Sequence, residues 1–409
     1  MLVAVSAHSL YLSPYLRPFV QAGATVYDNG LTGVVEHLDL DPTADAVVRA
    51  LWGARSTEAA LGALVETHGD AAVVAAIEGL AERMMVFRDR TQCELTFDAL
   101  LDAGQPEVPF LDQIELTNRC PFRCQFCPRG VPGKMTRPVG FMDLSLFEKL
   151  LRQLHPMQAR YRPLELHHLG ESLLHPEVDR FAAAAAARGL PTELSVNPAL
   201  LDPDLGKRLL AAGVRRLVIS LDGMDDETSI AIRGPAARYG KSEENLDALL
   251  GAVAGMRDPP TVVVQMIDLH KNRHQREAFL ARWGQSNLPT VHAVIKDLDG
   301  ADPDLGRPTS RPLVYLCSYP WRSVVVLWDG RVVPCCRDDD AHLPLGDLRE
   351  ESLAEIWRGP RAAELRARHR SGDVPAGHLC HGCDWRRDRF AATLHHRHPD
   401  RARPNPYQW

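Results

Sequence analysis

Residues 113–127, QIELTNRCPFRCQFC, place three closely spaced cysteines directly after a strand-like segment. Residues 113–117 have the composition of a strand, and Cys120, Cys124 and Cys127 follow on what we expect to be one tight loop. A structural zinc site or a closed four-thiolate iron cluster requires four ligands, and this loop supplies three. Three thiolates can hold three irons of a cubane and leave the fourth iron open to a substrate. The alternative is a structural zinc knuckle that takes a histidine as its fourth ligand.

The composition of the chain is that of a globular protein. Its 409 residues predict two or three domains. A net charge of -6 provides no general attraction to nucleic acid or to an anionic membrane. No stretch reaches the ~18 apolar residues of a membrane span, and the first residues lack the basic region of a signal peptide. We therefore expect a cytoplasmic protein with neither a nucleic-acid nor a membrane partner.

Strand-like and helix-like segments alternate from residue 110 to about residue 297. Repeated β-α units predict a parallel sheet with right-handed crossovers, and six units form a partial barrel whose functional residues lie at the carboxyl ends of the strands. The expected strands are 113–117, 164–169, 192–196, 215–222, 261–268 and 290–296, and the expected helices include 144–154, 203–212 and 243–256.

Residues 1–85 predict a small module that contains a hairpin and three helices. Apolar runs at 24–27 and 31–35 flank Asn29-Gly30, and both of these residues tolerate the positive φ of a tight turn. Helical patterns cover 44–51, 58–66 and 71–83, with Gly53 and Gly69 as the expected ends. This arrangement is typical of a winged helix.

A second group of cysteines lies toward the C-terminus. Cys317 and Cys335 bracket a hairpin expected at 324–327 and 331–333, and Cys380 and Cys383 form a CxxC pair. Four thiolates at these positions can converge on one iron–sulfur cluster, but a zinc ribbon uses similar ingredients. A helix is expected to begin after the hairpin, at the capping box Ser352-x-x-Glu355.

The first cysteine motif resembles that of the radical S-adenosylmethionine (SAM) superfamily. The resemblance rests on the CxxxCxxC spacing, on an aromatic residue before the last cysteine, and on the position after the first strand of a β/α series. It implies a partial (β/α)6 barrel in which Cys120, Cys124 and Cys127 hold a [4Fe-4S] cluster. It also implies reductive cleavage of SAM to a 5′-deoxyadenosyl radical, with an electron from a donor of the flavodoxin or ferredoxin type.

The same resemblance implies which residues contact SAM. Gly170 and Glu171 lie where the family holds the methionyl ammonium, although Leu169 replaces the usual first glycine. Asn197 resembles the residue that contacts the ribose, and Pro198 follows it in place of the usual glycine. The remaining implied contacts are Phe126 beside the adenine, and Ser220 and Arg233 at the carboxylate, which suits the planar fork of an arginine.

The C-terminal cysteines resemble the SPASM/twitch extension, through the order C-x12-G-x4-C followed by CxxC. This implies one auxiliary iron–sulfur cluster, ligated by Cys317, Cys335, Cys380 and Cys383, that takes an electron from the substrate radical. Cys336 is left over, either as a hydrogen-atom donor or, more plainly, as a small buried hydrophobe or an alternative ligand. The other residues with no expected role in chemistry are Cys93, the run Asp338-Asp339-Asp340 and the tail residues His395, His396 and His398, the last two groups as solvated surface.

The N-terminal module resembles the small PqqD-like element that binds leader peptides of ribosomally made natural products. A leader would bind there by strand addition to the hairpin edge, and the alternative is a purely structural winged helix. The expected divisions of the chain are a module at 1–85, a linker at 86–109, a radical SAM core at 110–310, a SPASM/twitch domain at 311–390 and a tail at 391–409.

Three functions follow from these observations. The first is oxidative modification of a peptide, for example by a thioether crosslink. The second is dehydrogenation or epimerisation of a polyol or aminosugar, and the third is a zinc-bearing binding protein with no enzymatic activity. Four polar residues near strand ends are candidates for the substrate-side acid or base: His168, Gln265, Asp268 and Lys296.

Overall fold

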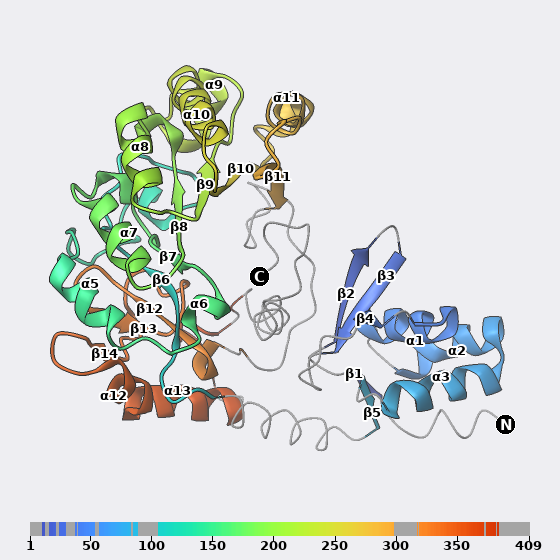
Figure 1. The fold of residues 1–409 in the computed structure, drawn as a ribbon. Coiled ribbons are helices and arrows are strands. Elements are labelled where there is room, and N and C mark those ends of the chain that lie inside the picture. Colours follow the sequence, from blue (N-terminus) through green and yellow to red (C-terminus); the bar gives the residue numbers. More distant parts are fainter. Residues whose placement is uncertain are drawn as a thin grey trace.

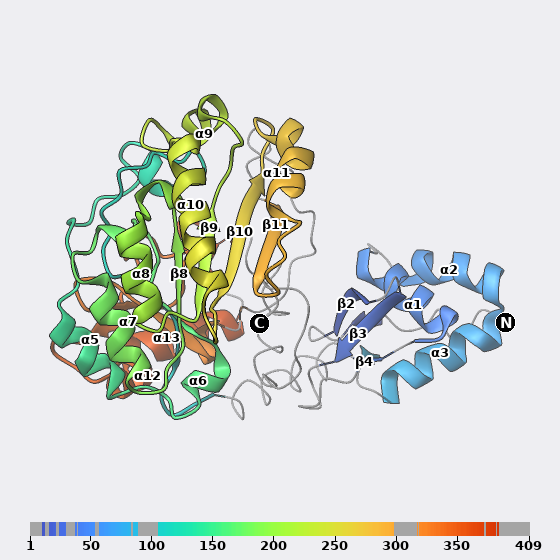
Figure 2. The same ribbon diagram turned by 45° about the horizontal axis from the view of Figure 1, so that its top comes forward.

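The computed structural model describes residues 10–12, 16–21, 24–29, 37–38, 40–53, 57–82, 85–88, 105–297, 317, 319–371, 374–381 and 383. Within these ranges the protein has a large sheet covered by helices and, in both views, a separate small group of N-terminal elements (Figures 1 and 2).

The large sheet has nine strands in the order β11-β10-β9-β8-β7-β6-β12-β13-β14. Its first six strands pair in parallel in sequence order, which confirms the predicted α/β class. Their bounds are β6 (Phe110–Ile114), β7 (Leu164–Glu165), β8 (Thr192–Val196), β9 (Arg216–Ser220), β10 (Thr261–Asp268) and β11 (Val291–Asp297). Three expected strands differ by more than one residue at an end: β6 begins and ends earlier than 113–117, β7 is shorter than 164–169, and β9 is shorter than 215–222.

Helices connect these strands and lie along the outer face of the sheet (Figures 1 and 2). They are α5 (Leu144–Leu151), α6 (Gln158–Tyr161), α7 (Val178–Ala186), α8 (Pro203–Ala211), α9 (Asp226–Arg233), α10 (Tyr239–Ala254) and α11 (Arg276–Trp283). Helix α8 begins where Asp202 accepts hydrogen bonds from two backbone amides, followed by Pro203 at its first position. Both features favour a helix start, because they satisfy or remove amides that have no partner within the helix.

Alternation along the strands gives the sheet two different faces. Leu194, Leu217, Val262 and Val264 are fully buried in one continuous core with residues of the covering helices. Burying one such side chain contributes about 1.5–3 kcal/mol. The opposite face is the barrel interior, and it carries polar residues in register with one another: Gln113, Glu165, Glu193 and Arg216.

The C-terminal hairpin belongs to the same sheet. Strand β12 (Ser323–Val326) pairs in parallel with β6, and β13 (Arg331–Val333) and β14 (Gly346–Asp347) follow in antiparallel order. The helices α12 (Leu353–Arg358) and α13 (Pro360–Ser371) come next. The predicted capping box at Ser352 and Glu355 is present. The second group of cysteines is therefore attached to the edge of the barrel by a continuous hydrogen-bond ladder.

The N-terminal elements form a three-stranded sheet, a two-stranded sheet and three helices. Strand β2 (Leu16–Gln21) pairs with β3 (Ala24–Asn29), β3 pairs with β4 (His37–Leu38), and β1 (Tyr11–Leu12) pairs with β5 (Val86–Phe87). Helices α1 (Pro42–Gly53), α2 (Thr57–His68) and α3 (Asp70–Glu82) agree with the three predicted helices and share a core of their own.

The predicted hairpin at Asn29-Gly30 is wrong in its register. Asp28 pairs with His37, so the connection after β3 is longer than a two-residue turn, and the strand expected at 31–35 lies outside the described residues. Among the helices that the structure describes, none is both long enough and apolar enough to cross a membrane.

Candidate active site

The three-cysteine loop leaves the carboxyl end of β6 and is fixed by the end of α9. The amide of Arg123 donates to the carbonyl of Arg233 at 2.8 Å, and that of Gln125 donates to the carbonyl of Ile232 at 3.0 Å. Gly130 closes the loop, and a Cβ there would overlap the carbonyl oxygen of Cys124. The loop therefore has one conformation that is set by its backbone contacts.

The three thiols of this loop lie close together in an apolar setting. Burial raises the pKa of Cys120 to about 12, and burial also raises the pKa values of Cys124 and Cys127. Phe122 and Ala237 pack around them. In the iron-free chain the thiols are therefore protonated, and iron binding must release these protons. Three thiols on one loop fit a cubane with one open iron better than they fit a closed site, which requires four ligands.

Gly170 and Glu171 pack directly on the chain that leads into the cysteine loop. Gly170 has a φ of +100°, and a Cβ there would overlap the carbonyl oxygen of Thr117 and lie 2.8 Å from Cα of Asn118. The amide of Glu171 donates to the carbonyl of Arg119 at 2.7 Å. Only glycine can adopt this positive φ without strain and leave room for the backbone of Thr117 and Asn118.

The Glu171 carboxylate connects two of the predicted SAM-contacting segments. It accepts hydrogen bonds from the amide of Asn197 at 2.9 Å and from the amide of Leu173 at 3.2 Å. Burial raises the pKa of Glu171 to about 7, against these two hydrogen bonds, which lower it. The side chain of Asn197 accepts from the amide of Ala199 and so caps the turn that follows.

Arg233 is a buried cation beside the cysteine loop. Its Nε and Nη2 both lie 2.6 Å from the same carboxylate oxygen of Asp222, and Nη1 lies 3.6 Å from Sγ of Cys124. Its guanidinium also lies over the ring of Phe126, 5.4 Å from the centroid. Burial opposes the charge, but Asp222 and Cys124 outweigh it and hold the pKa of Arg233 above its ordinary value. Ser220, the other predicted carboxylate contact, ends β9 opposite Gln265 of β10.

Several thiols of the second region lie close to that of Cys335. Burial raises the pKa of Cys335 well above its ordinary value, and the nearby thiols of Cys336, Cys317 and Cys380 act in the same direction. The amide of Cys383 lies 3.4 Å from the carbonyl of Cys380 in the CxxC turn. Cys336 therefore lies among the predicted ligands, while Cys93 and the three tail histidines lie outside the described residues.

Comparison with known proteins agrees with this geometry. The family model of the radical SAM superfamily matches residues 114–281, and that of the SPASM iron-sulfur cluster-binding domain matches residues 317–384. The protein is a radical SAM enzyme. Its cofactors are SAM, the [4Fe-4S] cluster of the radical SAM domain and, in the SPASM domain, auxiliary iron–sulfur clusters.

Its curated relatives include enzymes that act on different substrates. The PqqA peptide cyclase of Granulibacter bethesdensis is 24% identical over 307 residues, which cover 66% of this chain and 79% of the relative. The S-adenosyl-L-methionine-dependent 2-deoxy-scyllo-inosamine dehydrogenase of Niallia circulans is 19% identical over 275 residues, covering 66% and 91%. Among solved structures, Streptococcus suis SuiB has a TM-score of 0.49 at 14% identity and covers 87% of this chain and 90% of that one.

The interior of the radical SAM barrel carries a buried network of charges. Arg162 forms ion pairs with Asp112 and Glu165, and Arg216 forms one with Glu193. Glu165, His167 and Glu193 lie close enough together to resemble a metal site. Both glutamates already form ion pairs with arginines, so the group is better explained as a structural ion-pair network.

His168 extends this network toward the carboxyl ends of the strands. Gln113 Nε2 donates to Glu165 at 2.9 Å, so Gln113 Oε1 faces His168 Nδ1, also at 2.9 Å, and Nδ1 carries the proton. Nε2 of His168 is then a bare acceptor, and it is buried with no hydrogen-bond partner among the described residues. Burial, with help from the Arg137 charge, lowers the pKa of His168 to about 3.

The other three substrate-side candidates are placed differently. Asp268 forms ion pairs with Arg273 at 3.2 Å and Arg276 at 3.5 Å, so its charge is directed to the helix that follows β10. Gln265 faces Val294, and Lys296 faces Ile267, across the ladder of β10 and β11. Of the four, His168 is the one with a buried side-chain acceptor that has no hydrogen-bond partner among the described residues.

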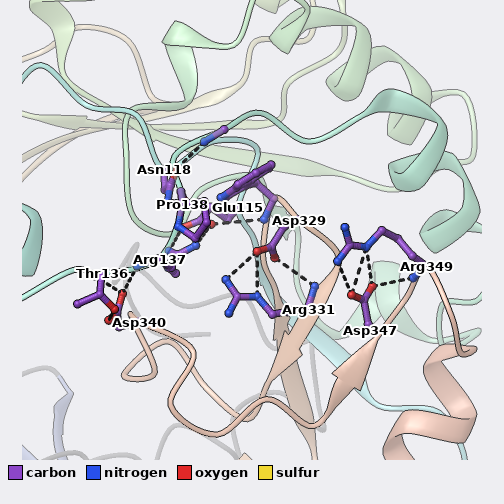
Figure 3. A network of polar contacts seen from close by, with 12 residues as sticks. Glu115, Asn118, Thr136, Arg137, Pro138, Asp329, Arg331, Asp340, Asp347 and Arg349 are labelled. Atoms are coloured by element: carbon purple, nitrogen blue, oxygen red, sulfur yellow. Dashed lines mark hydrogen bonds and ion pairs between the residues drawn. The ribbon is translucent and has the colours of Figure 1, made fainter.

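The predicted surface position of Asp338-Asp339-Asp340 is wrong. Asp338 is fully buried and accepts hydrogen bonds from the amides of His342 at 2.6 Å and Leu343 at 2.8 Å. Asp340 accepts hydrogen bonds from Thr136 and from the amide of Arg137, which follow the cysteine loop in the sequence (Figure 3). The ion pair between Glu115 and Arg137 was also not predicted from the sequence. The one indication in the sequence was an acidic residue within the strand expected at 113–117, at a position that alternation places on the same face as Gln113.

Proposed function

We propose that Cys120, Cys124 and Cys127 hold the cluster that binds SAM, and that Cys317, Cys335, Cys380 and Cys383 hold one auxiliary cluster. The observation that carries the first assignment is the rigid loop of three buried thiols at the carboxyl end of β6, within the matched radical SAM region. The second assignment rests on the thiols gathered around Cys335, within the matched SPASM region.

The residues around the first loop are suited to SAM. A SAM molecule bound there supplies a carbon radical after one-electron reduction. Glu171 offers a carboxylate to the methionyl ammonium, and the φ of Gly170 brings the chain close enough to present it. Arg233 offers Nη1 toward the methionyl carboxylate while Asp222 fixes its other nitrogens. Phe126, Asn197 and Ser220 complete the proposed set, at the adenine, the ribose and the carboxylate.

His168 is the proposed substrate-side base. When a substrate radical loses an electron to form a crosslink or a carbonyl, a proton must leave the substrate as well. Loss of the electron leaves a cation such as a protonated carbonyl, which is a far stronger acid than imidazolium. His168 can therefore take that proton at its bare Nε2 although burial lowers its pKa to about 3, and its Nδ1 stays committed to Gln113. Cys336 remains the proposed hydrogen donor only for a reaction in which the radical is reduced.

The proposed substrate is a ribosomally made peptide that the enzyme modifies oxidatively, for example by a thioether crosslink. Two features support a peptide. Relatives named PqqA peptide cyclase align with about two thirds of the chain. Strand β2 pairs with β3 alone within the described residues, which leaves an edge for a peptide to join, as in a PqqD-like module. The second candidate is dehydrogenation of a polyol or aminosugar, which the relative from Niallia circulans favours.

Anaerobic turnover tests the two candidates directly. Reconstituted protein, SAM and a strong reductant are incubated with synthetic peptides translated from short reading frames that flank the gene, or with 2-deoxy-scyllo-inosamine. A peptide that loses two hydrogens, with deuterium moving from its side chain into 5′-deoxyadenosine, supports the first candidate. Oxidation of the aminosugar in the absence of any peptide product contradicts it.

Two cysteine variants separate the roles of the proposed clusters. Cys124→Ala should abolish SAM cleavage, because it removes one of three ligands. Cys335→Ala should retain SAM cleavage and lose product formation, because the substrate radical no longer finds its electron acceptor. If the two variants behave alike, the assignment of separate clusters is wrong.

A further inference from the structure

A buried ion pair closes the loop that carries the first three cysteines. Glu115 lies just after β6 and before Cys120, and Arg137 lies after Cys127. The two terminal guanidinium nitrogens of Arg137, Nη1 and Nη2, donate to the two carboxylate oxygens of Glu115 at 2.6 and 2.5 Å. This bidentate pair fixes the distance between the two ends of the loop.

The same arginine also binds the segment that follows Cys335, one member of the second group of cysteines. Arg137 Nε donates to the carbonyl of Asp339 at 2.7 Å, and its amide donates to Asp340 at 3.0 Å. Thr136 donates to Asp340 through its amide at 2.8 Å and its hydroxyl at 2.6 Å. Asp340 lies two residues after a turn that begins at Cys335, in which the amide of Asp338 donates to the carbonyl of Cys335 at 3.1 Å. Figure 3 shows Thr136, Arg137, Glu115 and Asp340 in one cluster.

The burial of this cluster makes it a rigid junction. Arg137 is 6% exposed and Glu115 is fully buried, so neither charge has solvent as a substitute partner. The amide of Trp328 donates to Glu115 as well, at 3.3 Å, and the Trp328 ring fills the space beside Gly140. Lysine could supply the charge at position 137 but not the planar fork that reaches Glu115 and Asp339 together. The cluster therefore depends on the shape of arginine as well as on its charge.

We propose that Arg137 is a positioning residue that fixes the second cysteine centre relative to the first. In the proposed function, on which this inference rests, the substrate radical loses one electron and one proton, and the auxiliary cluster gains the electron. Arg137 is itself placed in neither group of cysteines. It sets where the segment 335–340 lies against the loop 115–137, and so sets the separation of the two clusters.

The experiment compares Arg137→Gln with a matched control, Arg216→Gln, in the anaerobically reconstituted full chain. Arg216 is also buried, at 7% exposed, and it forms an ion pair with a buried glutamate, Glu193. Both residues lie on barrel strands, β9 and β8, outside the segments 115–137 and 335–343. Three quantities are measured: iron per chain, the magnetic interaction between the two reduced clusters by electron paramagnetic resonance, and amide hydrogen exchange across residues 335–343.

For Arg137→Gln we expect iron content close to wild type, an altered magnetic interaction, and exchange across 335–343 faster by on the order of tenfold. Arg137→Lys should give exchange rates and a magnetic interaction between those of wild type and Arg137→Gln, because lysine keeps the charge but lacks the planar guanidinium fork. The control should change neither the interaction nor the exchange. An unchanged interaction and unchanged exchange in Arg137→Gln would overturn the proposal.

A second variant decides the matter if Arg137→Gln does not fold. Asp340→Ala removes the bonds to Thr136 and to the Arg137 amide, and it leaves the buried pair with Glu115 intact. It should speed exchange at 335–343 and alter the magnetic interaction, and wild-type values in both would contradict the proposal. Wild-type protein that holds only one cluster would instead refute the proposed function, which keeps the two failures distinct.

Discussion

Replacing Gly170 by alanine should destabilise the barrel at the point where the Gly-Glu turn meets the cysteine loop. The φ of +100° at this position is one that residues with a Cβ rarely adopt, and the new methyl group would overlap the carbonyl oxygen of Thr117. It would also lie 2.8 Å from Cα of Asn118 and 2.9 Å from the carbonyl oxygen of Arg119. All three contacts are with backbone atoms, which cannot move aside as a side chain would.

The cost has two parts that a second glycine can separate. A positive φ costs an alanine about 1–2 kcal/mol relative to glycine. Forcing a methyl group into packed backbone adds about 1–3 kcal/mol. Gly189 also has a positive φ, +68°, but no heavy atom lies within 4 Å of the point that an alanine Cβ would occupy, so Gly189→Ala carries the first cost alone. We therefore expect Gly170→Ala to lose more free energy of unfolding than Gly189→Ala, by about 1–3 kcal/mol.

Urea denaturation of the iron-free chain, followed by circular dichroism, measures this difference, and iron per chain after reconstitution measures its effect on the site. Gly170→Ala should also hold less iron, because the backbone that must shift leads directly into Cys120. Equal unfolding free energies for the two variants, together with equal iron loading, would refute the argument that contact with the cysteine loop selects glycine at position 170.

Three further outcomes follow from the site. The folded-state pKa of Glu171, about 7, lies above the ordinary value of 4.5, so between these pH values the folded iron-free chain binds one more proton than the unfolded chain. Its free energy of unfolding should therefore fall by about 3 kcal/mol as the pH rises from 4.5 to 7. Glu171→Gln should remove this pH dependence, which is measured as the urea midpoint at several pH values across the range. His168→Asn should leave SAM cleavage intact and lower product formation by about 10²-fold or more, whereas an unchanged ratio of product to 5′-deoxyadenosine would exclude His168 as the base. Asp222→Asn should cost about 3–5 kcal/mol in thermal or urea unfolding, because it leaves the buried charge of Arg233 without its carboxylate, and a loss below about 1 kcal/mol would show that Arg233 finds another partner.

The barrel could be predicted from the sequence because its strands and helices carry strong local patterns. The strands 192–196 and 261–268 were expected at the bounds the structure shows, because apolar Leu194 and Val196 alternate with polar residues in the first and the second contains the apolar run 262–264. The turn expected at Asn29-Gly30 failed because a tight-turn dipeptide states only a local preference, and the pairing of Asp28 with His37 needs a longer connection.

The junction between the two cysteine regions could not be predicted, for a physical reason. Asp340 and Arg137 are ordinary surface residues by composition, and only the tertiary fold brings them together and buries Arg137 against Glu115. A run of three aspartates is usually exposed to solvent, so local sequence patterns predict a surface position. Asp338 is buried because it accepts hydrogen bonds from the amides of His342 and Leu343, and those contacts exist only in the folded turn.

The pairing of β6 with β12 has a consequence for how the protein is made. Phe110 of β6 pairs with Ser323 of β12, so during translation β6 emerges from the ribosome long before β12 has been synthesised. During that interval one side of β6 is an unpaired edge, which can join other chains. Slower synthesis at low temperature should therefore not by itself improve the soluble yield, whereas holding the nascent edge with a chaperone until the C-terminal strands emerge should.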